Sequence, residues 1–114
     1  MTNHAKLSRE LALTLGYYPE NVRIVYSGTD YERCEVYRLP PSKHIDWPVW
    51  LKFDYRDPTV CLPLIEWLMR KHDAQPGYNA RGFHIWFQSH SVAAASADTL
   101  PEAVARAVIA VKKG

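Results

Sequence analysis

The 114-residue sequence is short of cysteine, of excess charge and of long apolar runs. Its two cysteines, Cys34 and Cys61, form neither a CxxC pair nor a zinc-ligand spacing, which indicates reduced core thiols rather than a redox or zinc motif. No apolar run approaches the roughly 18–20 residues that a membrane-spanning helix needs. Residues 1–4 are polar and carry no signal-peptide core, so we expect a cytoplasmic protein with no membrane partner.

Charges of the two signs nearly balance. There are 14 lysines and arginines against 12 aspartates and glutamates, and the resulting net charge of +2 is too small to predict a nucleic acid or an anionic membrane as partner. The five glycines match neither the P-loop nor the dinucleotide-binding pattern, and no GxSxG nucleophile elbow is present. We therefore predict a protein that is not an enzyme and holds no cofactor.

The length and composition are those of a single globular domain over residues 1–114. Helical and strand periodicities alternate along it. The expected class is α+β, a layered α/β sandwich with a mainly antiparallel sheet of four to five strands, three helices and the order α-β-β-β-α-β-β-α. The predicted elements are a helix over 4–15, strands over 21–26, 33–39 and 49–54, a helix from near Leu62 to 71 or 72, a loop over 73–82, strands over 82–88 and 92–97, and a closing helix from 99 or 100.

The closing helix has the clearest local signals. Thr99 and Glu102 form a capping box, in which each side chain accepts from the other residue's backbone amide. Pro101 falls in the first turn, where its missing N–H costs nothing. The buried stripe should comprise Leu100, Val104, Ala107, Val108 and Val111.

The strand over 82–88 has two different faces. Phe83, Ile85 and Phe87 alternate with polar or amphipathic residues, and Trp86 makes the second face partly apolar too, which predicts a central strand. An exposed tryptophan among polar neighbours is typical of an interface centre. Our leading hypothesis is therefore a non-enzymatic protein-interaction or self-association module whose interface candidates are His84, Trp86, Gln88 and His90.

The second half of the chain resembles the phage ABA sandwich domain, a family of short bacteriophage and prophage proteins without assigned function. The resemblance rests on Trp86, the run 94–97, the helix start 99–103 with Arg106-Ala107, and the segments 55–57 and 64–68. It covers about residues 53–112. It implies a layered α/β sandwich of viral or prophage ancestry in a bacterial host, and no catalytic residues.

Two further hypotheses come from other side chains. Aromatic and basic residues interleave between the hairpin and the second helix, and such a pattern can stack bases and neutralise phosphates. The candidates for single-stranded nucleic-acid binding are Trp47, Lys52, Tyr55 and Arg56. The other alternative is a metal site formed by His84, His90 and Cys34 or Cys61, although no short-range ligand pair is present and we predict no metal ligands.

Overall fold

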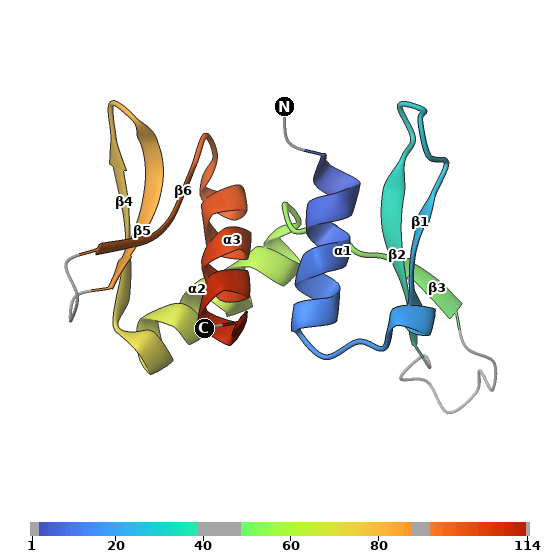
Figure 1. Ribbon diagram of the computed structural model, residues 1–114, viewed down its shortest axis with the longest axis horizontal. Helices are drawn as coiled ribbons and strands as arrows, with labels where there is room; N and C mark the ends of the chain where they lie inside the picture. Colours follow the sequence, from blue (N-terminus) through green and yellow to red (C-terminus); the bar gives the residue numbers. More distant parts are fainter. Residues whose placement is uncertain (1–2, 39–48, 88–91, 114) are drawn as a thin grey trace. The chain divides into compact units, whose positions relative to one another are not determined.

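The computed structural model describes residues 3–38, 49–87 and 92–113. The chain divides into two compact units, Met1–Asp54 and Tyr55–Gly114, each with its own antiparallel sheet (Figure 1). The α+β class and the three α-helices are confirmed, whereas one sheet of four to five strands is wrong, because there are two sheets of three strands each. The single-domain expectation stays a prediction. No helix within the described ranges is long and apolar enough to cross a bilayer.

The first unit is a helix on a three-stranded sheet. Asn3 caps the helix by accepting the backbone N–H of Lys6 at 3.0 Å, and Gly16 follows its end with a φ of 106°, as its sequence position predicts. The sheet order is β1-β2-β3, with antiparallel neighbours. The elements are α1 (His4–Thr14), the 3-10 turn η1 (Pro19–Asn21), β1 (Val22–Val25), β2 (Arg33–Arg38) and β3 (Val49–Lys52).

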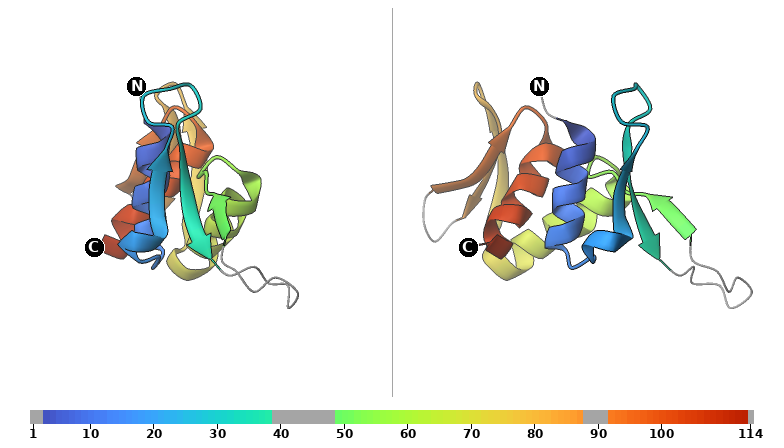
Figure 2. Two further views of the ribbon diagram at one scale, coloured as in Figure 1. Left: turned by 90° about the vertical axis from the view of Figure 1, so that its right-hand side faces the viewer. Right: turned by 45° about the vertical axis from the view of Figure 1, so that its right-hand side comes forward.

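Helix α1 lies along one face of the first unit's sheet, where Figure 2 shows it beside β1 and β2. Strand alternation sends every second side chain to that face. The buried residues that result are Leu7, Leu11 and Ala12 from α1, and Val22, Cys34 and Val36 from the sheet. The opposite face therefore receives the intervening residues of β1, β2 and β3.

The second unit has two helices on one face of its sheet, whose order is β4-β5-β6. Helix α2 contacts β4, while α3 contacts β5 and β6. The elements are α2 (Pro58–His72), β4 (Ala74–Asn79), β5 (Gly82–Phe87), β6 (Val92–Ala97) and α3 (Leu100–Lys113). The central position of β5 is confirmed.

Helix α2 begins four residues before the predicted Leu62. Asp57 caps it by accepting the backbone N–H of Thr59 at 3.0 Å, and Pro58 occupies the first turn. Pro63 consequently lies inside the helix rather than at its start. Leu62 is 61% exposed, whereas Cys61 and Leu68 are the buried residues of this helix.

Strand β4 replaces part of the predicted loop over 73–82. The Pro76-Gly77 pair has the sequence of a turn, yet both residues pair with β5, opposite Ile85 and His84. A proline is compatible with this position because β4 is an edge strand of the described sheet, where its missing N–H breaks no ladder. The element order is thus α-β-β-β-α-β-β-β-α, with one strand more than predicted.

The predicted cap of α3 is confirmed for one of its two hydrogen bonds. Thr99 Oγ1 accepts the backbone N–H of Glu102 at 3.4 Å, while the Glu102 carboxylate lies 3.4 Å from Arg106. Of the expected stripe, Val104, Ala107 and Val108 are buried, whereas Leu100 and Val111 near the two ends of the helix are only half-buried.

The backbone conformation and surroundings of Gly82 predict that any side chain at this position lowers the free energy of unfolding. Its φ is +110°, and a Cβ there would lie 2.6 Å from the carbonyl oxygen of Ala97 in the neighbouring strand. Gly16 has a nearly equal φ of +106° but nothing within 4 Å, so Gly16→Ala isolates the backbone cost. We expect Gly16→Ala to lower the free energy of unfolding by about 1 kcal/mol and Gly82→Ala by about 3 kcal/mol, measured by urea denaturation. Equal losses would contradict the close approach of β5 and β6 here.

Candidate binding face

The face of the β1–β2–β3 sheet opposite α1 holds a group of cationic and aromatic side chains. The antiparallel register places Glu35 of the central strand between Arg23 on one side and Lys52 on the other. Two residues further along β2, on the same face, Tyr37 lies opposite Trp50. We call this group the Arg–Trp face; it consists of Arg23, Arg33, Glu35, Tyr37, Trp50 and Lys52.

Glu35 holds two arginines at once. Its Oε1 accepts from Arg23 Nε at 2.9 Å and Nη2 at 2.7 Å, and its Oε2 accepts from Arg33 Nε at 3.1 Å and Nη2 at 2.8 Å. The Glu35 side chain is only 6% exposed, whereas the two arginines are 45% and 42% exposed. Each carboxylate oxygen thus fixes one guanidinium, and both guanidiniums still reach solvent.

The electrostatics of this group favour the ionised carboxylate. Burial acts to raise the pKa of Glu35, but the hydrogen bonds and positive charges of Arg23 and Arg33 outweigh it and hold that pKa below its ordinary value. Three cations and one carboxylate on the face leave an excess of two positive charges. The six residues of the Arg–Trp face therefore carry a net positive charge, and two acids, Asp30 and Glu32, lie at its border.

Aromatic rings complete the face. The Arg23 guanidinium carbon lies 4.0 Å from the centroid of the Trp50 ring, within cation–π range. The Tyr37 and Trp50 rings meet edge to face with centroids 5.2 Å apart. Arg23 is consequently held in two directions, by Glu35 and by Trp50, and Trp50 by two neighbours.

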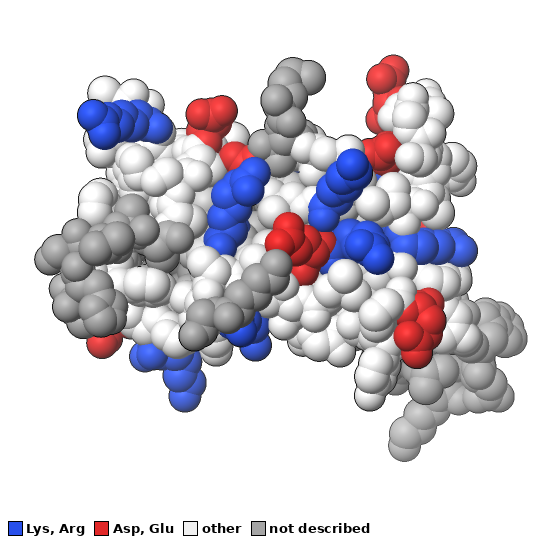
Figure 3. All heavy atoms as spheres, viewed as in Figure 1, with Lys and Arg blue, Asp and Glu red and all other residues white. Residues whose placement is uncertain are grey.

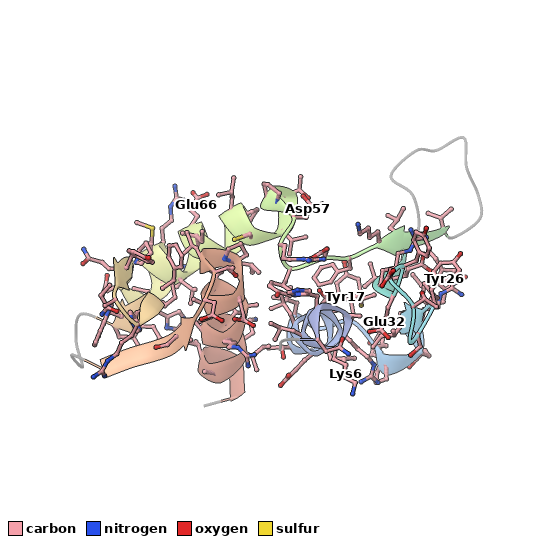
Figure 4. All side chains as sticks on the ribbon, turned by 90° about the horizontal axis from the view of Figure 1, so that it is seen from above. Lys6, Tyr17, Tyr26, Glu32, Asp57 and Glu66 are labelled. Carbon is pink, nitrogen blue, oxygen red and sulfur yellow. The ribbon has the colours of Figure 1, made fainter. Side chains whose placement is uncertain are left out.

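The β1–β2 hairpin loop borders the Arg–Trp face with two exposed tyrosines, Tyr26 and Tyr31. Glu32 organises the loop by accepting the backbone N–H of Gly28 at 2.9 Å and the hydroxyl of Ser27 at 3.2 Å. The Gly28 hydrogen bond is the main reason why the pKa of Glu32 is lowered. Figure 4 shows Tyr26 and Glu32 at this hairpin. A shallow cavity of about 460 Å³ is lined by Tyr26, Asp30, Tyr31, Glu32, Arg33 and Lys52.

Charge elsewhere on the molecule is mixed. On the face seen in Figure 3, lysine and arginine side chains alternate with aspartate and glutamate, and no large area of one sign appears among the residues drawn in colour. On helix α2, for example, Arg70 pairs with Glu66 at 2.7 Å in an exposed i,i+4 pair. The Arg–Trp face differs because its acid is buried and its bases are not.

The side chains predicted to bind single-stranded nucleic acid do not share one environment. Lys52 is exposed on the Arg–Trp face, and Arg56 is exposed in the turn before α2. Tyr55 is only 1% exposed, so its predicted role in stacking a base is wrong, because its ring belongs to the core. Trp47 lies outside the described residues.

Two of the predicted interface residues lie on one face of the β4–β5–β6 sheet, and their role in an interface stays a prediction. Trp86 is 38% exposed. His84 is on the same face but is 7% exposed rather than solvent-facing, because hydrogen bonds to Asn79 and Ser96 and contact with Trp86 enclose its ring. Gln88 and His90 lie outside the described residues.

Neither cysteine has the surroundings of a reactive thiol. Both are free and buried, and burial raises the pKa of Cys34 to about 11 and also raises that of Cys61. Among the residues that the structure describes, no three histidine, cysteine, aspartate or glutamate side chains gather where they could hold a metal ion. The absence of a metal site stays a prediction for the whole chain.

The residues of the Arg–Trp face other than Lys52 were not predicted as a site. Strand alternation over 21–26 already separates Arg23 from Val22 and Ile24, which is the one local signal available. That Glu35 would meet Arg23 depends on the register of the hairpin, since the two residues are 12 positions apart. Charged residues flanking a turn are ordinarily solvated, so the sequence alone does not predict a buried Glu35.

The double ion pair predicts that Glu35 matters for stability in a pH-dependent way. We expect Glu35→Gln to lower the free energy of unfolding at pH 7 by about 2 kcal/mol, because two guanidiniums lose their carboxylate. The folded-state pKa lies below the ordinary value of 4.5, so the carboxylate's contribution is complete above that pH and is lost as the pH falls through the lower folded-state pKa. The difference between variant and wild type should therefore shrink in acid.

A matched control is Glu66→Gln, which removes the exposed pair with Arg70. It should cost about 0.5 kcal/mol or less, because solvent screens such pairs. Urea denaturation of both variants from pH 7 to pH 3 measures these differences. Equal losses for Glu35→Gln and Glu66→Gln would contradict a structural role for the double ion pair.

Comparisons with known proteins assign neither a family nor a function to this chain. No family model, no curated protein and no solved structure matches the chain. The resemblance to the phage ABA sandwich domain stays a prediction. Any functional conclusion consequently rests on the geometry of the described residues.

Proposed function

We propose that this chain is a non-enzymatic protein-interaction module that binds an acidic protein partner through the Arg–Trp face. One observation carries the proposal: two half-exposed arginines are held on a single buried glutamate beside a half-buried tryptophan. The proposed phage or prophage ancestry is independent of this site and depends on the resemblance of residues 53–112.

The composition of the face supports this proposal. Arginine, tyrosine and tryptophan are the residues most enriched among those that carry the binding energy of protein interfaces. Arg23, Tyr37 and Trp50 provide all three types, and Trp50 contacts both of the others. An open sheet face with only a shallow cavity at its border suits a protein surface better than a small molecule, which prefers a deep and largely apolar pocket.

Preorganisation favours binding as well. Immobilising a long side chain at an interface costs roughly 0.5–1.5 kcal/mol. In the free protein, Arg23 and Arg33 are already held by two hydrogen bonds each. Their side chains therefore lose less conformational entropy when a partner binds. Their remaining N–H groups can then bind a carboxylate of the partner with the geometry already set.

The sign of the charge selects the partner. The excess of two positive charges on the face attracts an acidic surface and repels a second copy of itself. A protein partner rich in aspartate or glutamate is therefore favoured over self-association through this face. We place the interaction in the cytoplasm because both cysteines are free thiols, as a reducing compartment keeps them.

A peptide selection tests this proposal. A random-peptide library selected on the immobilised wild-type protein should yield acidic sequences. Their affinity, measured by fluorescence polarisation, should fall at least about tenfold for the double variant Tyr37→Ala, Lys52→Ala, because one aromatic contact and one charge are lost. This variant leaves the Arg23–Glu35–Arg33 group intact, so folding is preserved.

Arg70→Ala is the matched control, since it removes one exposed cation from helix α2. Selected peptides should bind it as they bind the wild type. If the selection enriches no acidic sequences, or if they bind the double variant and the wild type equally, the Arg–Trp face is not the binding surface.

Single-stranded nucleic acid is the second candidate ligand, because Lys52, one of the residues predicted for that function, shares a sheet face with Trp50. Aromatic and cationic side chains on an open sheet can stack bases and neutralise phosphates. The balanced charge of the whole chain argues against it, so we rank it below a protein partner.

Fluorescence titration with an oligothymidylate separates the two candidates. If Arg23, Arg33 and Lys52 each neutralise one phosphate, the affinity should fall about 20-fold between 50 and 200 mM salt. Trp50→Phe should remove the part of the fluorescence change that comes from this face. Unchanged fluorescence at low salt would exclude nucleic acid and leave the protein partner.

A further inference from the structure

His84 on the central strand β5 is held from both neighbouring strands. Its Nδ1 lies 2.6 Å from Ser96 Oγ on β6, and its Nε2 lies 2.9 Å from Asn79 Oδ1 at the end of β4. The ring is 7% exposed and its centroid is 5.8 Å from that of Trp86. A serine, a histidine and an amide thus form one chain of hydrogen bonds across three strands.

The direction of these hydrogen bonds follows from a fourth group. The backbone N–H of Arg81 donates to Asn79 Oδ1 at 2.8 Å, which identifies that atom as the amide oxygen. Since an oxygen without a hydrogen can only accept, His84 Nε2 must carry the proton. In the neutral imidazole Nδ1 is then unprotonated and accepts the hydroxyl proton of Ser96.

We propose that Ser96 is a nucleophile that accepts acyl groups from small esters, with His84 as its general base and Asn79 as a positioning residue. Ser96 Oγ forms a bond to the ester carbonyl carbon, and the bond from that carbon to the leaving oxygen breaks. The serine proton passes to His84 Nδ1 and from there to the leaving group or to water. The product is an acyl-serine, and no oxidant or cofactor is needed.

Access and substrate class follow from the neighbours. Ser96 is exposed on β6, which is an edge strand of the described sheet, so an ester can reach it from solvent. Trp86 adjoins the imidazole and is 38% exposed, which offers a flat apolar surface for an aromatic leaving group or acyl chain. The site lies in the second unit and uses no residue of the Arg–Trp face, so this inference goes beyond the proposed binding function.

The experiment uses p-nitrophenyl acetate with the full chain. Release of p-nitrophenolate should accompany the addition of one acetyl group, which peptide mass spectrometry should map to Ser96. Ser96→Ala should abolish that adduct, and His84→Gln should slow its formation by at least about 100-fold, because the general base is lost. Acetylation confined to lysines, or an equal rate in Ser96→Ala, overturns the proposal.

The role of Asn79 needs a readout that a structural role alone would not change. Asn79→Ala should slow acetylation by about tenfold or more, since the tautomer is no longer fixed, whereas Asn79→Asp retains an acceptor and should restore the rate. The nitrogen chemical shifts of His84 should report protonated Nε2 in the wild type and in Asn79→Asp, but a tautomer mixture in Asn79→Ala. The same tautomer in all three proteins would overturn the positioning role.

Ser27→Ala is the matched control. Ser27 is an exposed serine whose hydroxyl donates to the Glu32 carboxylate at 3.2 Å. Its removal should leave the rate and the site of acetylation unchanged. Circular dichroism and the thermal midpoint of each variant establish that it is folded, and a folded Ser96→Ala that reacts like the wild type rejects the assignment.

Discussion

Each sheet has three strands and helices of its own unit on one face only, and this constraint shapes both candidate sites. On the face that the helices do not cover, side chains from the central strand lie between those of the two neighbouring strands. Both central positions here hold a polar group, Glu35 on β2 and His84 on β5, and both are buried. A buried polar group must find its partners nearby, because leaving it unpaired costs roughly 1–3 kcal/mol, and more when it is charged. Each therefore gathers partners from its own strand or the adjacent ones.

The group around Glu35 is charged and the group around His84 is neutral, and the two groups therefore suit different chemistry. Glu35 is ionised and takes two guanidiniums, so the face around it keeps positive charge and holds its cations in fixed directions. His84 is held by the neutral side chains of Asn79 and Ser96. These hydrogen bonds fix the position of the imidazole relative to the Ser96 hydroxyl and add no charge to the site. A fixed cationic surface is suited to recognising an acidic partner, whereas an ordered imidazole beside a hydroxyl is suited to moving a proton.

The sequence could predict what depends on near neighbours. The cap at Thr99, the helical spacing of Val104 and Val108, and the turn at Gly16 are local, and all agree with the structure. Strand β4 was missed because Pro76-Gly77 has the signature of a turn, and only pairing with β5 reveals it as an edge strand. Pro63 has the sequence signature of a first-turn proline and so predicts a later start for α2, whereas Asp57 and Pro58 supply the actual start.

The candidate sites were harder to predict because their residues meet through register. Glu35 and Arg23 are 12 residues apart, as are His84 and Ser96, and neither pair belongs to a motif of fixed spacing. Alternation separates Arg23 from Val22 and Ile24, and His84 from Phe83 and Ile85, but it does not show which face the helices cover. It could not show that each face would bury its central residue, since burial depends on side chains from neighbouring strands.

A single irregularity in the β5–β6 pairing determines whether the serine site exists. The ladder runs with Trp86 opposite Ala93 and Phe87 opposite Val92, then shifts by one residue between Ile85 and Trp86. Had the pairing of Trp86 and Ala93 continued without the shift, Ser96 would stand opposite Phe83, on the face that contacts the helices. The bulge instead brings Ser96 opposite His84 and onto the exposed face. Bulges occur preferentially beside functional sites, where they redirect a side chain, and this one redirects the only residue of β6 whose hydroxyl can reach the imidazole.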